Sequence, residues 1–143
     1  MDEQQMYEEL YEVAEQAREN AFAPFSKFRV GAALLVNGDC EDPSELIYTG
    51  ANIENSSYGA TICAERVAFV KAISEGVLND CGHEVPFVAI AVSAGDEEAI
   101  PCGICRQFMY EFAPDLTVIT KRDGKLRIQS LRDLLPDGFR LNR

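Results

Sequence analysis

Two short cysteine groups, 39 residues apart, constrain the fold of this chain more than any other feature of its sequence. The first is Cys63-Ala64-Glu65-Arg66, and the second is Pro101-Cys102-Gly103-Ile104-Cys105. The CxxC spacing of the second group lets two sulfurs reach one ion from the start of a single helix. The residue pattern predicts helices over 63–75 and from Pro101 to about Phe112. A shared metal ion therefore requires these two helices to begin side by side.

The chemistry of these groups indicates a catalytic zinc site. Unpaired backbone N–H groups at a helix N-terminus favour the thiolate over the thiol. Three protein ligands, here Cys63, Cys102 and Cys105, would leave a fourth position of Zn²⁺ to water, which is typical of catalytic rather than structural zinc. Glu65 follows Cys63 by two residues, so we expect its carboxylate near the metal as a proton carrier and not as a ligand. Alone, Glu65 would be interpreted as a charge that favours the helix dipole.

Two arginines and the single histidine bear on how this site works. Arg66 and Arg106 lie close to ligands in the sequence, and we expect them to hydrogen-bond the sulfurs and draw charge from a three-thiolate zinc. The alternative is that both are ordinary surface arginines. His83 is the only histidine, and ligation by it would close the site into a structural centre. Its loop position favours a solvated side chain.

The composition is that of a soluble globular protein. The chain has 143 residues, of which 47 % are hydrophobic and 26 % charged, and this fits one domain over residues 1–143. A chain of this length can bury a core without disulfides or a metal. A metal bound here is therefore expected to serve chemistry.

The charge distribution argues against nucleic-acid and membrane partners. The net charge is −11, and a mainly acidic surface repels phosphate backbones. Residues 121–143 are basic, but their charges alternate with apolar residues, which favours an ordinary surface over a nucleic-acid-binding arm. No apolar run approaches the ~20 residues that a membrane helix needs.

The cysteines and the N-terminal residues predict a cytoplasmic protein. The N-terminal residues MDEQQMYEEL are acidic and lack the apolar core of a secretory signal. The five cysteines form an odd set, and unpaired thiols indicate a reducing compartment. Outside the two motifs, Cys40 and Cys81 are interpreted as ordinary thiols in loops.

Apolar spacing also predicts the rest of the elements. A helix over 3–20 would bury one face, made of Met6, Leu10, Val13, Ala14 and Ala17. In the helix over 63–75 we expect an inward face of Val67, Val70 and Ala72 or Ile73, and Gly76 is placed to end that helix.

The predicted strands make a mixed sheet. Residues 28–36 and a strand beginning near 47–49 would pair as a hairpin across an Asn37-Gly38 turn. The apolar run 86–94 suits a central strand that is covered on both faces. Strands are also expected at 116–120 and 125–128, before a closing helical turn at 131–135. This order predicts an α/β fold with helices packed against the sheet.

Taken together, the motifs closely resemble the zinc cytidine/deoxycytidine deaminases of the small homotetrameric type. Zinc deaminases share H-x-E followed by P-C-x-x-C, with the glutamate carrying protons. Here Cys63-Ala64-Glu65 replaces H-x-E, as in the three-cysteine variant. The likeness extends from about Ala23 to Phe139. It implies a three-layer fold with a mixed five-stranded sheet and helices on both faces, and a homotetramer whose subunits share active sites.

The resemblance also implies substrate contacts. Phe28, in the segment Pro24–Ala33, would stack on the pyrimidine ring, and the backbone of Ala64 would orient its exocyclic amine. Asn52 and Glu54 would hold the ribose 3′-hydroxyl. Phe25 stands where the family often has tyrosine.

Two further contacts come from segments near the middle and the end of the chain. In the resemblance, Tyr58 would reach the sugar in a neighbouring subunit's site, and Phe139, which follows Leu134-Leu135-Pro136, would close over the base. Without the resemblance, Phe28 could equally be a core residue and Phe139 part of a frayed tail.

The implied reaction is the hydrolytic deamination of free cytidine or deoxycytidine to uridine or deoxyuridine and ammonia, as in pyrimidine salvage. Glu65 would move a proton from zinc-bound water to ring N3, and hydroxide would attack C4. Two alternatives stay open. One is a deaminase of a cytosine-containing antibiotic, against which Asn52 and Glu54 argue. The other is a non-catalytic interaction module stapled by a closed zinc site.

Overall fold

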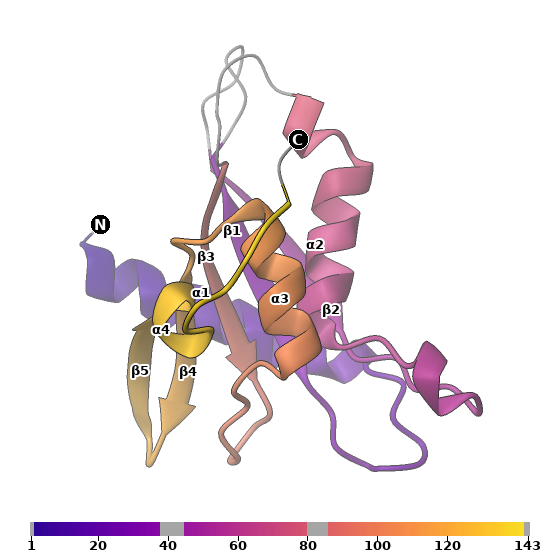
Figure 1. The fold of residues 1–143 in the computed structure, drawn as a ribbon. Coiled ribbons are helices and arrows are strands. Elements are labelled where there is room, and N and C mark those ends of the chain that lie inside the picture. The colour runs from indigo at the N-terminus through magenta and orange to yellow at the C-terminus, as the bar shows by residue number, and fades with distance from the viewer. Residues whose placement is uncertain (1, 38–44, 80–85, 142–143) are drawn as a thin grey trace.

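The computed structural model describes residues 2–37, 45–79 and 86–141 (Figure 1). The expectations for the 37–38 turn, Cys40, Cys81 and His83 involve residues outside these ranges. The described elements, in chain order, are α1 (Glu3–Ala17), η1 (Arg18–Asn20), β1 (Gly31–Val36), β2 (Leu46–Ala51), η2 (Tyr58–Ala60), α2 (Ala64–Ser74), η3 (Val77–Asn79), β3 (Phe87–Ser93), α3 (Gly103–Phe112), β4 (Thr117–Arg122), β5 (Lys125–Ser130) and α4 (Leu131–Leu134).

The five strands form one mixed sheet in the order β2-β1-β3-β4-β5. Only the β3–β4 pair is parallel among these neighbours, because α3 carries the chain back across the sheet between them. Every residue of β1 is buried, and β3 is buried at all but one position. A strand that is apolar on both sides needs cover on both sides. The expected central strand at 86–94 is confirmed.

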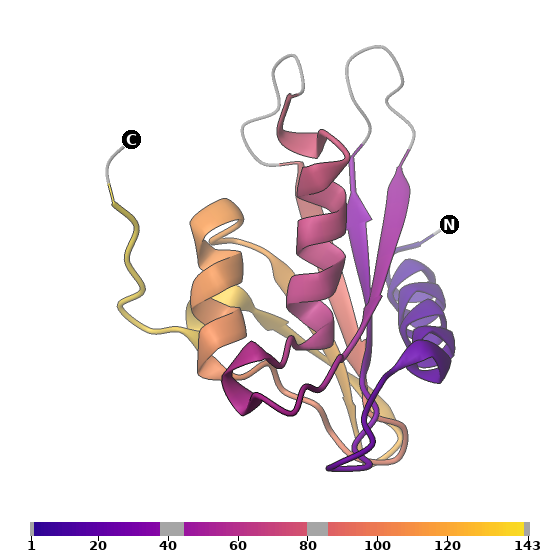
Figure 2. The same ribbon diagram turned by 90° about the vertical axis from the view of Figure 1, so that its right-hand side faces the viewer.

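Helices cover both faces of the sheet, so the fold has three layers with the sheet in the middle (Figure 2). On one face, Leu10, Tyr11 and Ala14 of α1 pack against Leu35 and Ile119 of the sheet. The other face packs against α2 and α3, and it contains the larger core cluster. The expected mixed five-stranded sheet with helices on both faces is therefore confirmed. No helix in the described ranges is long and apolar enough to cross a membrane.

An aromatic cluster fixes α2 against α3. The ring of Phe69 on α2 lies 6.3 Å from the rings of both Phe108 and Phe112 on α3, and 4.8 Å from Phe87 on β3. Such pairs contribute about 0.5–1.5 kcal/mol each beyond the burial of their surface. The two helices that follow the cysteine motifs are thereby held side by side, as the shared metal site requires.

A close backbone approach fixes the start of α2 against the sheet. A Cβ on Gly50 of β2 would lie 2.3 Å from the carbonyl oxygen of Ala64 and 2.6 Å from the amide nitrogen of Ala68. Only a glycine lets strand and helix backbones come this close. Because Ala64 lies between Cys63 and Glu65, this contact positions both residues.

Two sequence-based expectations about these elements were wrong. The strand expected from residue 28 begins at Gly31, because the Phe28 carbonyl and the Val30 amide bond the Asn52 side chain. Val70 is exposed, and the inward face of α2 is built on Ala68, Phe69 and Ala72. This helix is apolar around much of its circumference, so spacing alone left its buried face ambiguous. The packing of the Phe69 ring decides it.

Candidate active site

Three cysteine sulfurs meet where α2 and α3 begin. Cys63 is the N-cap residue of α2, and Cys102 is the N-cap residue of α3. Their sulfurs are 3.8 Å apart, and all three sulfurs, including that of Cys105, lie within 4.8 Å of one another. A disulfide bond would be about 2.05 Å long, so these are free thiols gathered in one cluster.

This cluster fits a tetrahedral zinc ion. Zinc–sulfur bonds of about 2.3 Å at tetrahedral angles place neighbouring sulfurs about 3.8 Å apart. The Cys63–Cys102 distance matches that spacing. Cys105 is buried, Cys63 is half-buried and Cys102 is exposed, so the cluster opens toward solvent on the Cys102 side. Thiolates are preferred zinc ligands, and the three residues can hold one such ion.

Hydrogen bonds within the cluster favour a thiolate at Cys63. The bond with the Cys105 thiol, together with the Arg66 guanidinium, lowers the pKa of Cys63 to about 5. The same bond raises the pKa of Cys105. Because a thiolate is the form that binds metal, one sulfur of the cluster is already biased toward ligation.

Glu65 is a buried carboxyl beside these sulfurs. Only 4 % of the residue is exposed, and its side chain is hydrogen-bonded with Cys105. Burial, with a smaller contribution from the nearby Cys63, raises its pKa to about 7. A carboxyl with a pKa near neutrality can both take up and release a proton. The alternative interpretation, a charge that only favours the helix dipole, does not account for this burial.

The two arginines differ in their contacts. Nη2 of Arg66 lies 3.8 Å from the sulfur of Cys63 and 3.3 Å from the Thr61 carbonyl oxygen. Arg66 therefore contacts one sulfur as expected, and its effect on a bound zinc ion stays a prediction. Arg106 instead donates to the carbonyl oxygens of Pro101, at 2.7 Å, and Leu134, at 2.8 Å. None of its described hydrogen bonds reaches a sulfur, so that expectation was wrong. Arg106 ties the start of α3 to the C-terminal segment.

Asn52 and Glu54 hold the loop that carries Phe28. The Asn52 amide donates to the Phe28 carbonyl oxygen at 2.8 Å and accepts from the Val30 amide at 2.9 Å. The Glu54 carboxylate accepts from the backbone amides of Phe25, at 2.9 Å, and Ser26, at 3.2 Å, and from the Ser26 hydroxyl. The hydrogen bond from the Ser26 hydroxyl lowers the pKa of Glu54. Both residues therefore shape the loop in addition to any contact with a ligand.

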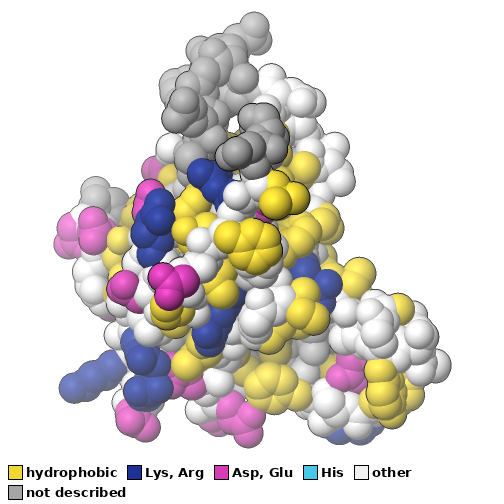
Figure 3. All heavy atoms as spheres, in the orientation of Figure 1, with side chains coloured by type: hydrophobic (Ala, Val, Ile, Leu, Met, Phe, Trp, Pro, Cys, Tyr) yellow, Lys and Arg dark blue, Asp and Glu magenta, His cyan; other side chains and the backbone are white. Residues whose placement is uncertain are grey.

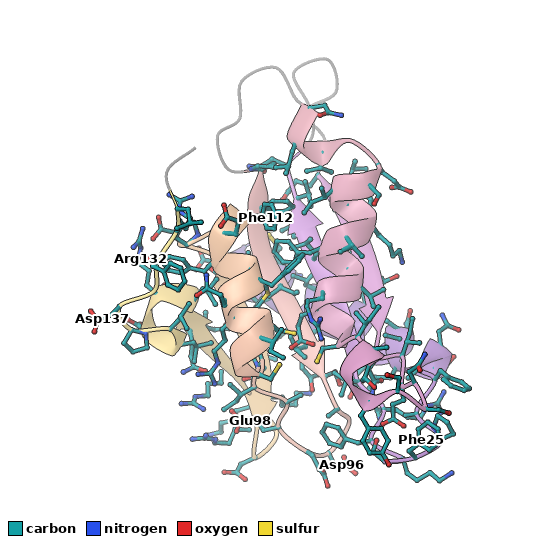
Figure 4. The ribbon with its side chains drawn as sticks, turned by 45° about the vertical axis from the view of Figure 1, so that its right-hand side comes forward. Phe25, Asp96, Glu98, Phe112, Arg132 and Asp137 are labelled. Carbon is teal, nitrogen blue, oxygen red and sulfur yellow. The ribbon has the colours of Figure 1, made fainter. Side chains whose placement is uncertain are left out.

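A cavity of about 320 Å³ lies beside this loop. It is lined by Phe25, Ser26, Glu54, Asn55, Tyr58 and Thr61. Figure 4 shows Phe25 at this end of the molecule, on the loops outside the sheet. Sequence reasoning did not single out Ser26, Asn55 or Thr61. Serine in a turn is a frequent hydrogen-bonding residue, and that was the signal available for Ser26.

Three further sequence-derived site residues, all aromatic, are exposed in the single chain, whereas Ala64 is buried. Phe28 is 39 % exposed, Tyr58 79 % and Phe139 63 %, so none of them is a core residue. The carbonyl oxygen of Phe139 accepts from the Gln107 side chain at 3.1 Å, which ties the C-terminal segment to α3. The structure brings together the three cysteines, Glu65 and Arg66, and it leaves Tyr58 and Phe139 facing outward.

Comparison with known proteins decides the family. The family model described as the cytidine and deoxycytidylate deaminase zinc-binding region matches residues 4–121. The chain belongs to this deaminase family. Zinc is therefore the metal that the cysteine cluster is built to hold.

Relatives of this deaminase match it over almost its whole length. It is 44 % identical to a cytidine deaminase of Halalkalibacterium halodurans over 97 % of this chain and 95 % of that protein. A crystal structure of cytidine deaminase from Burkholderia pseudomallei has a TM-score of 0.79 at 40 % identity, covering 97 % of this chain and all of that one. The cytidine deaminase of Mycobacterium tuberculosis gives a TM-score of 0.74 at 35 % identity, with 99 % and 100 % covered.

Proposed function

We propose that this protein is a zinc-dependent hydrolase that converts free cytidine and deoxycytidine to uridine and deoxyuridine, with release of ammonia, in pyrimidine salvage. The observation that carries the proposal is the buried carboxyl of Glu65 beside three clustered cysteine sulfurs at two helix starts. Membership of the deaminase family supports it.

Each residue of the cluster has a role in this proposal. Cys63, Cys102 and Cys105 hold the zinc, which supplies a water molecule of lowered pKa as the nucleophile for C4. Glu65 takes up one proton and delivers it to ring N3 of the base. It then assists the departure of the amino group as ammonia. Arg66 draws charge from the Cys63 thiolate, and the Ala64 backbone orients the exocyclic amine.

The nucleoside would bind across the loop that Asn52 and Glu54 hold. Phe28 stacks on the pyrimidine in this proposal, and the two polar side chains bind the 3′-hydroxyl. Their bonds to the loop leave capacity for this, because the Asn52 side-chain amide has a second N–H and Oε2 of Glu54, which among the described residues accepts only from the Ser26 hydroxyl, has a further lone pair. These contacts favour a nucleoside over a cytosine-containing antibiotic.

Asn52→Asp is expected to lower kcat/KM for cytidine by about 10- to 100-fold, the effect of losing one or two good hydrogen bonds. The new carboxylate oxygen would face the Phe28 carbonyl oxygen, which now receives an N–H at 2.8 Å. Initial rates over a range of cytidine concentrations measure the effect.

Asn55→Asp is the matched control for this substitution. Asn55 lines the cavity, and in the described part of the chain its side chain accepts from the Ser57 amide at 2.9 Å. Because a carboxylate can keep that bond, near wild-type kinetics are expected. Equal losses in both variants would show that added negative charge, and not the Asn52 bond, causes the effect.

The activity itself is tested by cytidine turnover, followed as loss of absorbance, with and without a zinc chelator. We expect turnover that chelation abolishes and added zinc restores. A cytosine-containing antibiotic assayed in parallel is expected to react far more slowly. Protein that holds zinc and turns over neither compound would instead be an interaction module.

We further propose a cytoplasmic homotetramer whose subunits share active sites. Figure 3 shows hydrophobic side chains exposed on the face that carries α3 and the C-terminal segment, where Ile104 is 66 % and Phe139 63 % exposed. Contact with other copies would cover this face and let Tyr58 reach a neighbouring site, while Phe139 closes over the base. The free thiols of the cluster agree with a reducing compartment, and the net charge of −11 argues against a nucleic-acid polymer as partner.

A further inference from the structure

The segment between β3 and α3, residues 94–102, delivers two of the three zinc-site cysteines. It opens with a tight turn in which Ala94 bridges to Glu97 and Gly95 has a φ of +76°. The Ser93 hydroxyl accepts from the Gly95 amide at 3.2 Å. The segment then runs through Glu98 to Cys102, the N-cap residue of α3. Its path decides where Cys102 and Cys105 stand relative to Cys63, which belongs to a different element.

Glu98, in the middle of this segment, is held by two arginines. Nε of Arg122 donates to one carboxylate oxygen of Glu98, and Nη1 of Arg127 donates to the other at 2.9 Å. The Glu98 side chain is 17 % exposed, compared with 54 % for Arg122 and 33 % for Arg127. Two cations on one partly buried carboxylate form a stronger link than a single exposed ion pair.

The register of the β4–β5 hairpin explains why both arginines reach the same carboxylate. Arg127 on β5 pairs with Thr120 on β4, and Arg122 lies two residues beyond Thr120. Residues two apart in a strand share a face, so both guanidinium groups leave the hairpin on one side. Figure 4 shows Glu98 at the end of the molecule where α3 begins and this hairpin turns. The hairpin is part of the sheet and offers a fixed support.

We propose that Glu98 is a positioning residue for the zinc site: its two arginine contacts fix the 94–102 segment to the sheet and slow the release of zinc. Departure of the metal requires Cys102 and Cys105 to move away from Cys63. A segment fixed at Glu98 resists that movement, because Cys102, the N-cap residue of α3, follows only four residues later. The inference rests on the zinc site and makes Glu98 a residue that acts through the ligands without touching the metal.

Glu98→Gln tests the proposal, because it removes the charge and keeps the shape. The zinc-loaded variant is mixed with an excess of the chromogenic chelator 4-(2-pyridylazo)resorcinol, and zinc transfer is followed by absorbance. We expect release to be about five-fold faster than in the wild type, which corresponds to about 1 kcal/mol, the upper end for an ion pair of limited burial. Arg127→Gln removes one of the two partners of Glu98 and is also expected to accelerate zinc release.

A double variant and a control separate positioning from a general loss of surface charge. If Glu98 and Arg127 act through one link, the Glu98→Gln/Arg127→Gln protein releases zinc no faster than the faster single variant. Asp115→Asn removes an exposed ion pair with Arg132 of α4. This pair does not involve the 94–102 segment, so the rate of zinc release should stay unchanged. Far-UV circular dichroism checks that all variants are folded.

Three results would overturn the proposal. The first is a zinc release rate in Glu98→Gln equal to that of the wild type. The second is a double variant whose acceleration is the sum of the two single effects. The third is an acceleration in Asp115→Asn as large as that in Glu98→Gln. If the purified wild-type protein is found to contain no zinc, the zinc site itself is overturned together with this inference. A wild type that holds one zinc, with unchanged release from Glu98→Gln, would overturn the role of Glu98 alone.

Discussion

Glu65→Gln is expected to retain zinc and fold and to lose cytidine deamination by at least about 10²–10⁴-fold, the range of general acid–base contributions. Glutamine has the same shape and can occupy the same buried position. It cannot take up or release a proton, so no proton is delivered to ring N3 or to the leaving amino group. Because the residue it replaces is 4 % exposed, bulk water does not readily substitute for the missing carboxyl.

The measurement combines initial rates of cytidine turnover with zinc content by elemental analysis on the same preparations. Glu75→Gln, just beyond the far end of α2, is the control and should keep wild-type rates. Wild-type turnover by Glu65→Gln would remove the proton-carrying role from Glu65. Loss of zinc from Glu65→Gln would instead make Glu65 part of the metal-binding set.

Cys105→Ala is expected to lower zinc affinity by more than about 100-fold, because losing a residue that only supports a ligand already costs about 10–100-fold. Two sulfurs would remain to hold the ion. Cys105 is fully buried within the core cluster, so alanine leaves only a small void and the protein should still fold. Activity should fall with the zinc content and should not return at moderate concentrations of added zinc.

Zinc content after dialysis and competition with a chelator of known affinity measure this change. Cys40→Ala, which alters a cysteine outside both motifs, should keep full zinc content and activity. Full zinc occupancy in Cys105→Ala would show that Cys105 is not a ligand. Equal losses in Cys40→Ala would place Cys40 in the metal site.

The sequence was sufficient to predict the core of the site because its signals are local. CxxC spacing, a cysteine that opens each helix and a glutamate two residues beyond Cys63 are short-range patterns that the structure realises within single turns. The same holds for the central strand, whose continuous apolar run requires cover on both faces.

What sequence reasoning missed depends on contacts between distant residues. The Asn52 side chain keeps the preceding strand from beginning before Gly31, because it bonds backbone groups 22 and 24 residues away. The guanidinium of Arg106 donates to the carbonyl oxygen of Leu134, 28 residues away, and this partner is not visible in the local motif. The two arginine contacts of Glu98 depend on the register of the β4–β5 hairpin, which follows α3 in the chain. Residue spacing carries no information about such partners until the sheet order is known.

Zinc K-edge X-ray absorption on the purified protein tests most directly whether the site has three cysteine ligands and an open position. The proposed site should give three sulfur scatterers at about 2.3 Å and one light atom at about 2.0 Å, without the outer-shell pattern of an imidazole ring. A fourth sulfur, an imidazole contribution from His83, or the absence of zinc would contradict it.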